Sequence, residues 1–552
     1  MSLIRKYPRS SGVLLPITAL HGSFGIGVIG KEAFEFVDFL CHAGFHAWQV
    51  LPVEHTGMCN SPYKCISAFA GEPNLIDPRM LLEMGLITES ELLKRMDGVS
   101  DAHVDFDLIR NKQWELLQAA FLRLNDIPCC GPAIGFDSAT DSGDCDTELE
   151  TLRFESCREA NVTLDLHEYK NFNPFWLEEY ALFISIKQQF DFQPWFRWSD
   201  SGLRRHSPDA IREFRQKHGD KLEFHRFVQW LFDKQWQNLR GYAAKRGISI
   251  IGDMPIYVSE NSAEVWSHRE YFGADAEGNF VAIGGVPPDY FTPDGQCWGN
   301  PIYNWELQER DNYEWWINRL RASLERYDVV RLDHFRGFAS YWRIPGGEIT
   351  ARNGKWINGP GMKLFNALEK ALGDLTLSII AEDLGIVDED VEELLVDSGF
   401  RGMRVLQFGF IGDEHHLPHN YPENSIAYTG THDNTTLLAW VFELAPEDRE
   451  KALFYTGFDG DWTIGGPNCP VIKSFMRTLF MTPASLAIVP IQDMLGYGAD
   501  TRTNTPGVPT GNWRFRIREG VLNDIDVGFY TELHKLFQRE DSVKEFKPRA
   551  KK

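Results

Sequence analysis

The amino-acid sequence predicts an α/β protein whose core is a closed (β/α)8 barrel with large helical insertions between its strands. Eight short apolar runs, rich in Val and Ile, recur along the 552 residues, and most of them close on polar or charged residues. Segments with a helical pattern of apolar residues separate many of these runs. Runs that are apolar on both faces are typical of parallel strands, and strand–helix alternation repeated eight times indicates a barrel.

The predicted elements follow one another along the chain. The eight strands are expected at 12–17, 46–53, 248–258, 327–335, 377–385, 402–409, 425–433 and 486–494. Helices are expected at 31–43, 224–246, 313–326, 361–372, 388–398 and 471–480 because apolar residues recur there at near-helical spacing. Each of these helices precedes a predicted strand.

The spacing of the strands is uneven, and two connections are far longer than one helix. The connection 54–247 contains further helical patterns at 108–124 and 174–190, which predicts a mainly helical insertion subdomain at 78–225. It also contains an acidic stretch at 128–150, expected to be a solvated surface loop. The connection 259–312, rich in Gly, Pro and aromatic residues, is expected to be a loop-rich insertion that covers the active site. Residues 1–552 are expected to form one barrel domain with these insertions.

A doubly wound dinucleotide-binding fold is the structural alternative. Residues 25–30 spell Gly-x-Gly-x-x-Gly, and Glu54 follows the second apolar run. That fingerprint normally opens directly from a strand, however, and here residues 18–24 intervene. A glycine-rich loop is the simpler interpretation.

Composition narrows the class of protein. Hydrophobic residues make up 43% and aromatic residues 13%, which excludes a disordered chain. A net charge of −23 disfavours nucleic acid and anionic membranes, since both require clustered Lys and Arg. Nine cysteines without a Cys-x-x-Cys pair indicate reduced thiols rather than a disulfide framework or a zinc site. The N-terminal residues contain no apolar leader, so we expect a cytoplasmic protein.

Carboxylates stand in or at the ends of five predicted strands. They are Asp253, Asp333, Glu382, Asp433 and Asp493. Working groups in such barrels lie at the C-terminal ends of strands, and like charges brought together there are costly unless they serve a function.

Two of the strands suggest how these carboxylates are tuned. Arg331 and Asp333 are two residues apart, so they share one strand face, and Arg331 is expected to lower the pKa of Asp333 and keep it ionised. An ordinary salt bridge is the alternative. Glu382 has apolar neighbours in IIAEDLG, which are expected to raise its pKa and suit it to donating a proton.

Histidines near the later strands allow several interpretations. His432 and Asp433 are suited to recognising vicinal hydroxyls, or else to capping the helix that begins near Leu437. His415, His416 and His419 lie in a proline-flanked loop, which argues against a metal site there. We expect neither a metal nor a cofactor.

A pair of carboxyl groups, one ionised and one protonated, matches retaining glycoside chemistry, for which the two groups lie about 5–5.5 Å apart. Aromatic faces stack on sugar rings, and six aromatic residues crowd the connection after the third strand. They are Trp266, Tyr290, Phe291, Trp298, Tyr303 and Trp305. Together these features predict a carbohydrate-active barrel.

At these residues the sequence resembles the 4-α-glucanotransferases called amylomaltases or disproportionating enzymes, glycoside hydrolase family 77. The resemblance runs from about 11 to 516. Its motifs, in order, include SGVLLPITALHGSFGIG, WQVLPVEHTG, SPYKCISAFAGEPNLID, GDMPIYV, GVPPDYFTPDGQCWGNPIYNW, VRLDHFRGF, AEDLG, GMRVLQFGF, HLPHNYP, YTGTHDN and RTNTPGVPTGNWRFR. It implies the barrel of the α-amylase clan without a separate C-terminal β-domain and without required calcium. It also assigns residues 25–30 to a family loop.

The resemblance implies a role for each matching residue. Asp333 matches the nucleophile, Glu382 the general acid/base and Asp433 the carboxylate that stabilises the transition state. Residues matching substrate contacts are Tyr63, Asp253, Tyr290, Phe291, Trp298, Arg331, His334 and His432. The implied partners are maltooligosaccharides and α-1,4-glucans, bound by a monomer or small homo-oligomer.

The chain departs from the family pattern at a few positions. Thr435 follows His-Asp-Asn, Ala339 and Arg343 replace common acidic residues, and Met-Cys-Asn stands at 58–60. These changes bear on subsite preference and on the ratio of transfer to hydrolysis. An α-1,4-glucan hydrolase on the same barrel, or a noncatalytic glucan-binding protein, are the alternative functions.

Overall fold

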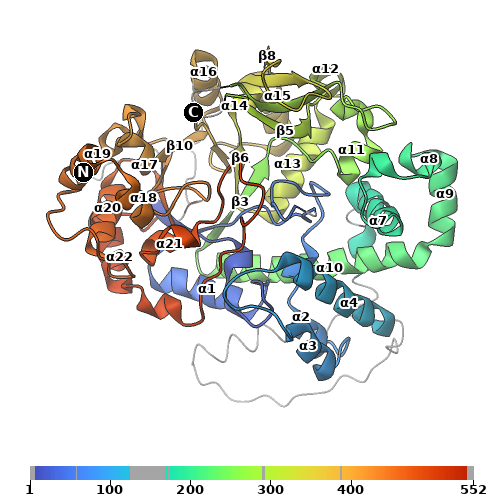
Figure 1. The fold of residues 1–552 in the computed structure, drawn as a ribbon, viewed down its shortest axis with the longest axis horizontal. Coiled ribbons are helices and arrows are strands. Elements are labelled where there is room, and N and C mark those ends of the chain that lie inside the picture. Colours follow the sequence, from blue (N-terminus) through green and yellow to red (C-terminus); the bar gives the residue numbers. More distant parts are fainter. Residues whose placement is uncertain are drawn as a thin grey trace, which may run out of the picture.

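Eight parallel strands close into a barrel in the computed structural model, which describes residues 7–57, 59–124, 166, 168–171, 174–288, 293–385, 388–541 and 543 (Figure 1). Around the barrel the order is β1-β12-β11-β10-β9-β6-β3-β2. The strands are β1 (Ser10–Leu14), β2 (Ala47–Gln49), β3 (Ser249–Pro255), β6 (Val329–Asp333), β9 (Ile379–Ala381), β10 (Arg401–Val405), β11 (Ser425–Tyr428) and β12 (Leu486–Pro490). Each predicted apolar run overlaps one of them, so the predicted fold class is confirmed.

The strands are apolar along their length because both of their faces are buried. Successive residues alternate between a cluster inside the barrel, which holds Ile251 and Val329, and the main core outside it, which holds Ile250 and Val330. All four of these side chains are 0% exposed. The period of two therefore carries every second residue of a strand into the barrel interior.

Helices surround the barrel where the apolar spacing predicts them. They are α1 (Lys31–His42), α10 (Gly219–Lys245), α13 (Glu314–Arg326), α15 (Met362–Leu372), α16 (Glu389–Ser398) and α20 (Pro470–Met481). Local sequence fixes the ends of α16: the Asp388 side chain accepts a hydrogen bond from Val391 N, and Gly399 ends the helix with φ +67°.

The long connection between β2 and β3 is mainly helical among its described residues. It contains α2 (Pro78–Glu83), α3 (Glu89–Met96), α4 (Phe106–Leu124), α7 (Pro174–Gln189), α8 (Ser201–Arg204) and α9 (Pro208–Lys217), followed by α10. The predicted acidic loop at 128–150 lies outside the described residues. Helices α7 and α9 project to one side of the barrel (Figure 1).

The closed barrel excludes the doubly wound alternative. In the loop that spells Gly-x-Gly-x-x-Gly, a Cβ on Gly27 would lie 1.9 Å from the Ile17 carbonyl oxygen. A Cβ on Gly30 would lie 1.7 Å from an Asp77 carboxylate oxygen. These two glycines therefore serve close packing within the fold.

The insertion at 259–312 is more regular than predicted. It contains α11 (Ala263–Ser267), α12 (Trp305–Arg310), β4 (Ala282–Val286) and β5 (Gln296–Pro301). The two strands join β7 (Ser340–Pro345) and β8 (Lys355–Asn358) in a four-stranded antiparallel sheet with the order β5-β4-β7-β8. Strand β4 is not recognisable from its sequence AIGGV, because the two glycines interrupt the alternation of apolar and polar residues that marks a strand. A Cβ on Gly285 would lie 2.1 Å from the Gln296 carbonyl oxygen, so the strand pairing itself requires glycine there.

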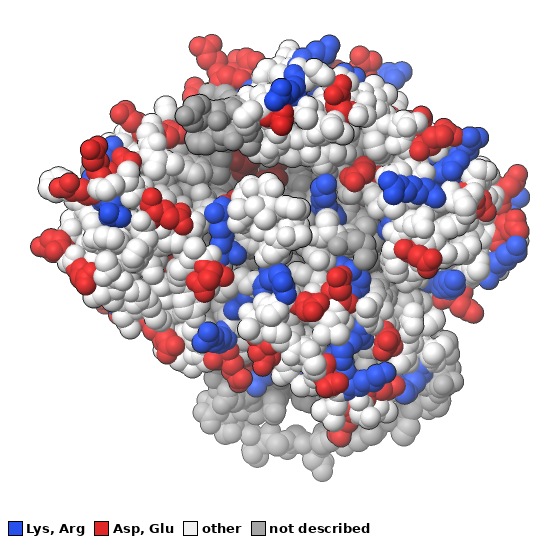
Figure 2. All heavy atoms as spheres, viewed as in Figure 1, with Lys and Arg blue, Asp and Glu red and all other residues white. Residues whose placement is uncertain are grey.

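The C-terminal half of the barrel is covered by further short helices. They are α14 (Arg336–Ala339), α17 (Leu406–Gly409), α18 (Leu437–Glu443), α19 (Pro446–Thr456), α21 (Ile491–Met494) and α22 (Val527–Phe537). No helix in the described part of the chain has the length and apolar character needed to cross a bilayer. On the face drawn in Figure 2, acidic and basic side chains are interspersed among the described residues.

Candidate active site

A cleft of about 1010 Å³ opens at the C-terminal ends of the barrel strands. Asp333 and His334 line it at the end of β6, Asp433 lies beyond β11, and Tyr63 and Trp298 reach it from two insertions. The period of two along a strand explains why Asp333 lies at the mouth of the barrel. Val329 faces the barrel interior, and Arg331 and Asp333, two and four residues further along β6, lie on the same face of the strand. Apolar side chains fill the barrel and charged ones emerge at its mouth.

Arg331 lies between two carboxylates at this mouth. Its Nη1 donates to both carboxylate oxygens of Asp253, at 2.8 and 2.7 Å, and its Nη2 lies 3.0 Å from Asp333 Oδ1. Arg331 is 4% exposed and Asp253 1%. The predicted pairing of Arg331 with Asp333 is therefore present, but as part of a trio in which Arg331 and Asp253 are buried and Asp333 faces the cleft.

Tyr63 extends this trio toward His432. The Tyr63 hydroxyl donates to Asp253 Oδ2 at 2.7 Å, and it lies 2.8 Å from His432 Nε2. Because the hydroxyl hydrogen is used for Asp253, His432 Nε2 must carry the proton that Tyr63 Oη accepts. The two rings stack at 5.3 Å. One hydrogen-bonded chain thus joins four of the predicted site residues.

Glu382 follows β9 and is held by backbone donors. Its Oε2 accepts from His334 N at 2.7 Å, and its Oε1 accepts from Leu384 N at 3.0 Å. His334 has φ +55°, a left-handed conformation that is rare for a residue with a Cβ. The strained turn after β6 therefore places a backbone N–H on the carboxylate of the neighbouring strand.

Burial opposes ionisation of both carboxyl groups. It raises the pKa of Asp333 to about 8, although the Arg331 guanidinium opposes that rise. Three other carboxylates add to it: Asp253, Glu382 and Asp433. The prediction that Arg331 keeps Asp333 ionised is therefore wrong in its net result, because burial outweighs the ion pair.

The predicted rise for Glu382 is confirmed, since burial raises its pKa above the ordinary value. Two neighbouring carboxyl groups that both resist ionisation titrate as a pair, so one carries charge while the other retains a proton. Burial also lowers the pKa of His334 to about 4, which keeps this imidazole neutral near pH 7.

Asp433 is positioned by a loop beyond β12. Asn504 Nδ2 donates to Asp433 Oδ1 at 2.6 Å, and the Arg502 guanidinium donates to the Asp433 backbone carbonyl. The alternative role of this segment as a helix cap is wrong, because the N-cap of α18 is Thr436, whose side chain accepts from Ala439 N.

One of the five strand-end carboxylates has a structural role. Asp493 is 1% exposed and accepts hydrogen bonds from Thr429 Oγ1 at 2.6 Å and Leu437 N at 2.7 Å. Burial raises its pKa to about 6. It ties α18 to the barrel and does not line the cleft.

Only part of the set of six aromatic residues in the connection after β3 lines the cleft. Trp298 lines the cleft and meets the His334 ring edge-on at 4.8 Å. Trp266 and Tyr303 are buried in the core, at 0% and 3% exposure, and Trp305 stacks on the core residue Trp316. Tyr290 and Phe291 lie outside the described residues. The amino-acid composition of this connection does not distinguish the aromatic residues that pack in the core from those that line the cleft.

Two cleft residues were not singled out by the sequence. Asn504 holds Asp433, and Trp513, with φ +67°, lies 5.8 Å from the Tyr63 ring and 6.0 Å from the His432 ring. The motif RTNTPGVPTGNWRFR contained both residues, but no strand end or charge marked them individually.

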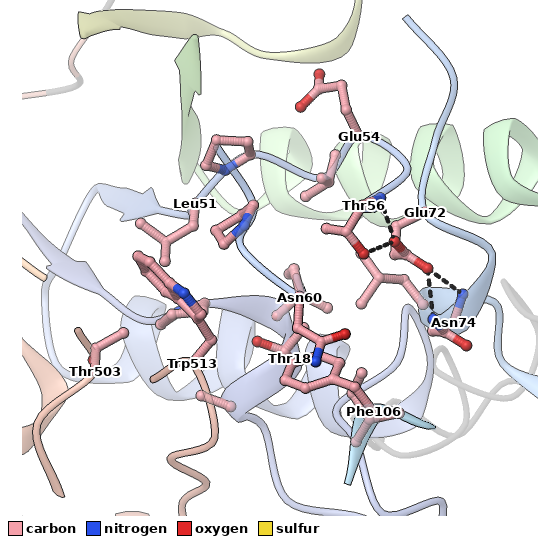
Figure 3. A pocket seen from close by; sticks show the side chains of 18 of the residues that line it. Thr18, Leu51, Glu54, Thr56, Asn60, Glu72, Asn74, Phe106, Thr503 and Trp513 are labelled. Atoms are coloured by element: carbon pink, nitrogen blue, oxygen red, sulfur yellow. Dashed lines mark hydrogen bonds between the residues drawn. The ribbon is translucent and has the colours of Figure 1, made fainter. Parts of the chain in front are cut away.

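Trp513 also closes a second, small pocket of about 40 Å³ beside the cleft (Figure 3). Glu72 connects two other residues in the lining of this pocket. Its Oε2 accepts from Thr56 Oγ1 at 2.7 Å, and its Oε1 accepts from Asn74 Nδ2 at 2.7 Å (Figure 3). The pocket has room for a few water molecules and not for a sugar.

No group of three or more His, Cys, Asp or Glu in the described ranges is arranged to hold a metal ion. The histidine loop has other partners. Val405 N donates to His416 Nδ1 at 2.9 Å, and His419 Nδ1 lies 2.8 Å from the Tyr455 hydroxyl.

The chain is similar to a group of glucan-transferring proteins. A family model described as 4-alpha-glucanotransferase matches residues 15–523. The 4-alpha-glucanotransferase of Thermus thermophilus is 41% identical over 521 residues, which cover 94% of this chain and 96% of that protein. The chloroplastic/amyloplastic 4-alpha-glucanotransferase of Arabidopsis thaliana is 37% identical, covering 94% of this chain and 83% of its own.

Solved structures agree with the sequence comparison. An amylomaltase from Streptococcus agalactiae, solved in complex with acarbose, matches with a TM-score of 0.86 at 37% identity, covering 96% of this chain and 99% of its own. An amylomaltase from Corynebacterium glutamicum matches with a TM-score of 0.70 at 17% identity, covering 97% of this chain and 75% of its own. The second match supports the fold alone.

Proposed function

Because the chain belongs to the 4-alpha-glucanotransferase family, we propose that the paired carboxyl groups in its cleft carry a retaining transfer of α-1,4-glucan segments. The donor is a maltodextrin, and the acceptor is the 4-hydroxyl of another glucan or of glucose. Asp333 is the nucleophile, Glu382 the general acid/base and Asp433 the carboxylate that stabilises the transition state.

The first step breaks the donor. Glu382 gives its proton to the glycosidic oxygen while ionised Asp333 attacks the anomeric carbon, and the reducing-end fragment leaves. This step requires one protonated and one ionised carboxyl group. Both carboxyl pKa values are raised, so the pair holds one proton. Arg331 Nη2, 3.0 Å from Asp333 Oδ1, favours Asp333 as the member of the pair that carries the charge and Glu382 as the one that keeps the proton.

The second step restores an α-1,4 bond. Glu382, now ionised, takes the proton from the acceptor 4-hydroxyl, which attacks the anomeric carbon and releases Asp333. Two inversions give net retention. The backbone N–H groups of His334 and Leu384, 2.7 and 3.0 Å from the Glu382 oxygens, support its ionised form between the steps.

Other cleft residues hold the sugar. We assign substrate contacts to Tyr63, Asp253, Arg331 and His432, which form one hydrogen-bonded chain at the strand ends. We assign further contacts to His334 and Trp298, whose rings meet in the cleft lining. Tyr290 and Phe291 keep the same proposed role. An aromatic side chain in the cleft lining, such as Trp298, excludes water from the site, which favours transfer to an acceptor sugar over hydrolysis.

The larger assignments are also proposals. Residues 78–225 act as a helical insertion subdomain and 259–312 as an insertion over the active site, supported by Cys297 and Trp298 in the cleft wall. The partners are maltooligosaccharides and α-1,4-glucans, without nucleic acid or membrane, for a cytoplasmic monomer or small homo-oligomer. A net charge of −23 is compatible with such neutral partners.

The observation that carries the proposal is the cluster of Asp333, Glu382 and Asp433 at the mouth of the barrel. Incubation with maltotriose tests it. A transferase yields glucose together with a ladder of longer maltodextrins, and Asp333→Ala yields neither. Glucose and maltose without longer products would indicate a hydrolase, and unchanged maltotriose would indicate a binding protein.

A further inference from the structure

Asp383 is a buried carboxylate that follows Glu382 in the chain and has no part in the two steps described above. It is 4% exposed. The pairing of β9 with β10 ends at Ala381 and Gly402. The next N–H along β10, that of Met403, donates to Asp383 Oδ1 at 2.5 Å. The Asp383 side chain therefore takes the place of a backbone acceptor at the point where β9 ends.

Two further features hold the same carboxylate against β10. Arg404 Nη1 donates to Asp383 Oδ2 at 2.9 Å. A Cβ on Gly402 would lie 2.5 Å from Asp383 Oδ2, and the three atoms nearest to that Cβ all belong to the Asp383 carboxylate. Because Gly402 has no side chain, the carboxylate can lie directly on the backbone of β10.

The position of Asp383 bears directly on Glu382. The peptide that joins Asp383 to Leu384 contains the N–H that donates to Glu382 Oε1 at 3.0 Å. On the other side the Glu382 backbone is tied to β6, since its N–H donates to Leu332 O at 3.0 Å and its carbonyl accepts from Phe335 N at 3.0 Å. The backbone around Glu382 is thus held by β6 on one side and, through the Asp383 side chain, by β10 on the other.

We propose that Asp383 is a positioning residue for the general acid/base, because its attachment to β10 fixes the peptide that presents Leu384 N to Glu382. The inference rests on the role of Glu382 proposed above. A misplacement of about 1 Å at a reacting group can cost on the order of 10²-fold in rate. A shift of this peptide would therefore slow the proton transfer and leave substrate binding intact.

Two variants disturb this attachment in different ways. Asp383→Asn keeps the shape of the side chain, but its amide can replace only one of the two acceptor oxygens. Gly402→Ala leaves Asp383 in the chain with its charge and displaces its carboxylate from β10. The matched control is Asp493→Asn, because Asp493 is also buried beyond a barrel strand and also accepts from a backbone N–H, but does not line the cleft.

Each chain is assayed on two substrates. Glucose release from maltotriose needs the proton of Glu382, whereas first-turnover fluoride release from α-maltosyl fluoride does not. Asp383→Asn and Gly402→Ala are each expected to lower kcat on maltotriose about 10- to 100-fold, with KM nearly unchanged, and to keep fluoride release within about twofold of wild type. Asp493→Asn should leave the ratio of the two rates at its wild-type value.

The ratio of the two rates separates positioning from a contribution to stability alone. An ion pair that only stabilised the fold would affect both substrates equally, so equal losses in Asp383→Asn and Gly402→Ala would overturn the proposal. A loss confined to Asp383→Asn would assign the effect to the charge and would overturn it too. An unaltered chain that cleaves maltotriose without forming longer products would refute the proposed transfer alone, because the ratio still tests Asp383.

Discussion

Replacing the nucleophile Asp333 with Asn should abolish transfer and stabilise the fold. The Asp333 carboxyl group has a pKa of about 8 in the folded chain against an ordinary value of 3.8. The unfolded chain is thus ionised above pH 3.8, whereas the folded chain resists ionisation up to about pH 8. Ionisation therefore destabilises the fold progressively between these values, and asparagine removes this penalty.

The size of the effect follows from the shift. At about 1.36 kcal/mol per pKa unit, the penalty at pH 7 reaches at most about 4 kcal/mol. The Asp333 side chain is 28% exposed, shares its titration with Glu382, and gives Arg331 an ion-pair partner that asparagine does not replace. We therefore expect a net stabilisation of about 1–2 kcal/mol at pH 7. The gross ionisation penalty is roughly three times larger at pH 8 than at pH 5, so the stabilisation should grow as the pH rises.

Denaturant unfolding of both chains at pH 5 and pH 8 measures this difference. Asp493→Asn is the comparison, because the Asp493 pKa of about 6 is raised less than that of Asp333, so the pH-dependent gain between pH 5 and pH 8 should be smaller. Asp493 also accepts hydrogen bonds from Thr429 and Leu437, and the amide of asparagine can replace only one of its two acceptor oxygens. An Asp333→Asn chain that is less stable than wild type, or equally stabilised at both pH values, would refute the electrostatic reasoning.

Three further changes probe separate contacts. Glu382→Gln should lower kcat on maltotriose by about 10²- to 10⁴-fold but spare the first step on α-maltosyl fluoride, whose leaving group needs no proton; equal loss on both substrates would contradict the acid role. Asn504→Leu removes the 2.6 Å hydrogen bond to Asp433 and should lower kcat about 10- to 100-fold with normal thermal stability, and unchanged kinetics would exclude a positioning role. Because His334 has φ +55°, His334→Gly should be about 1 kcal/mol more stable than His334→Ala in denaturant unfolding; the reverse order would show that the turn is unstrained.

The barrel could be predicted because its strands are buried on both faces. That burial leaves continuous runs of Val and Ile, which stand out against the polar sequence around them. The antiparallel sheet could not be predicted in the same way, since β4 uses glycines where its neighbours approach closely and β5 is half exposed. Its pattern is set by tertiary contacts that leave no periodic signal.

The candidate site likewise has residues that the strand pattern predicts and properties that only tertiary contacts determine. Asp333 and Glu382 are recognisable because Asp333 ends one apolar strand and Glu382 follows another, and strand parity carries both to the mouth of the barrel. Asp493 satisfies the same pattern yet serves the fold, since only its contacts with Thr429 and Leu437 distinguish the two roles. The net pKa of Asp333 likewise depends on how deeply the folded chain buries it, which the spacing of Arg331 and Asp333 does not contain.

The central claim is that Asp333 forms a covalent bond to the sugar. Glu382→Gln, incubated with α-maltosyl fluoride, should accumulate a glycosyl-enzyme, because the second step then lacks its base. Peptide mass spectrometry is expected to find the added maltosyl group on the peptide that contains Asp333. An adduct on Asp253 or Asp433, or fluoride release without any adduct, would contradict the account.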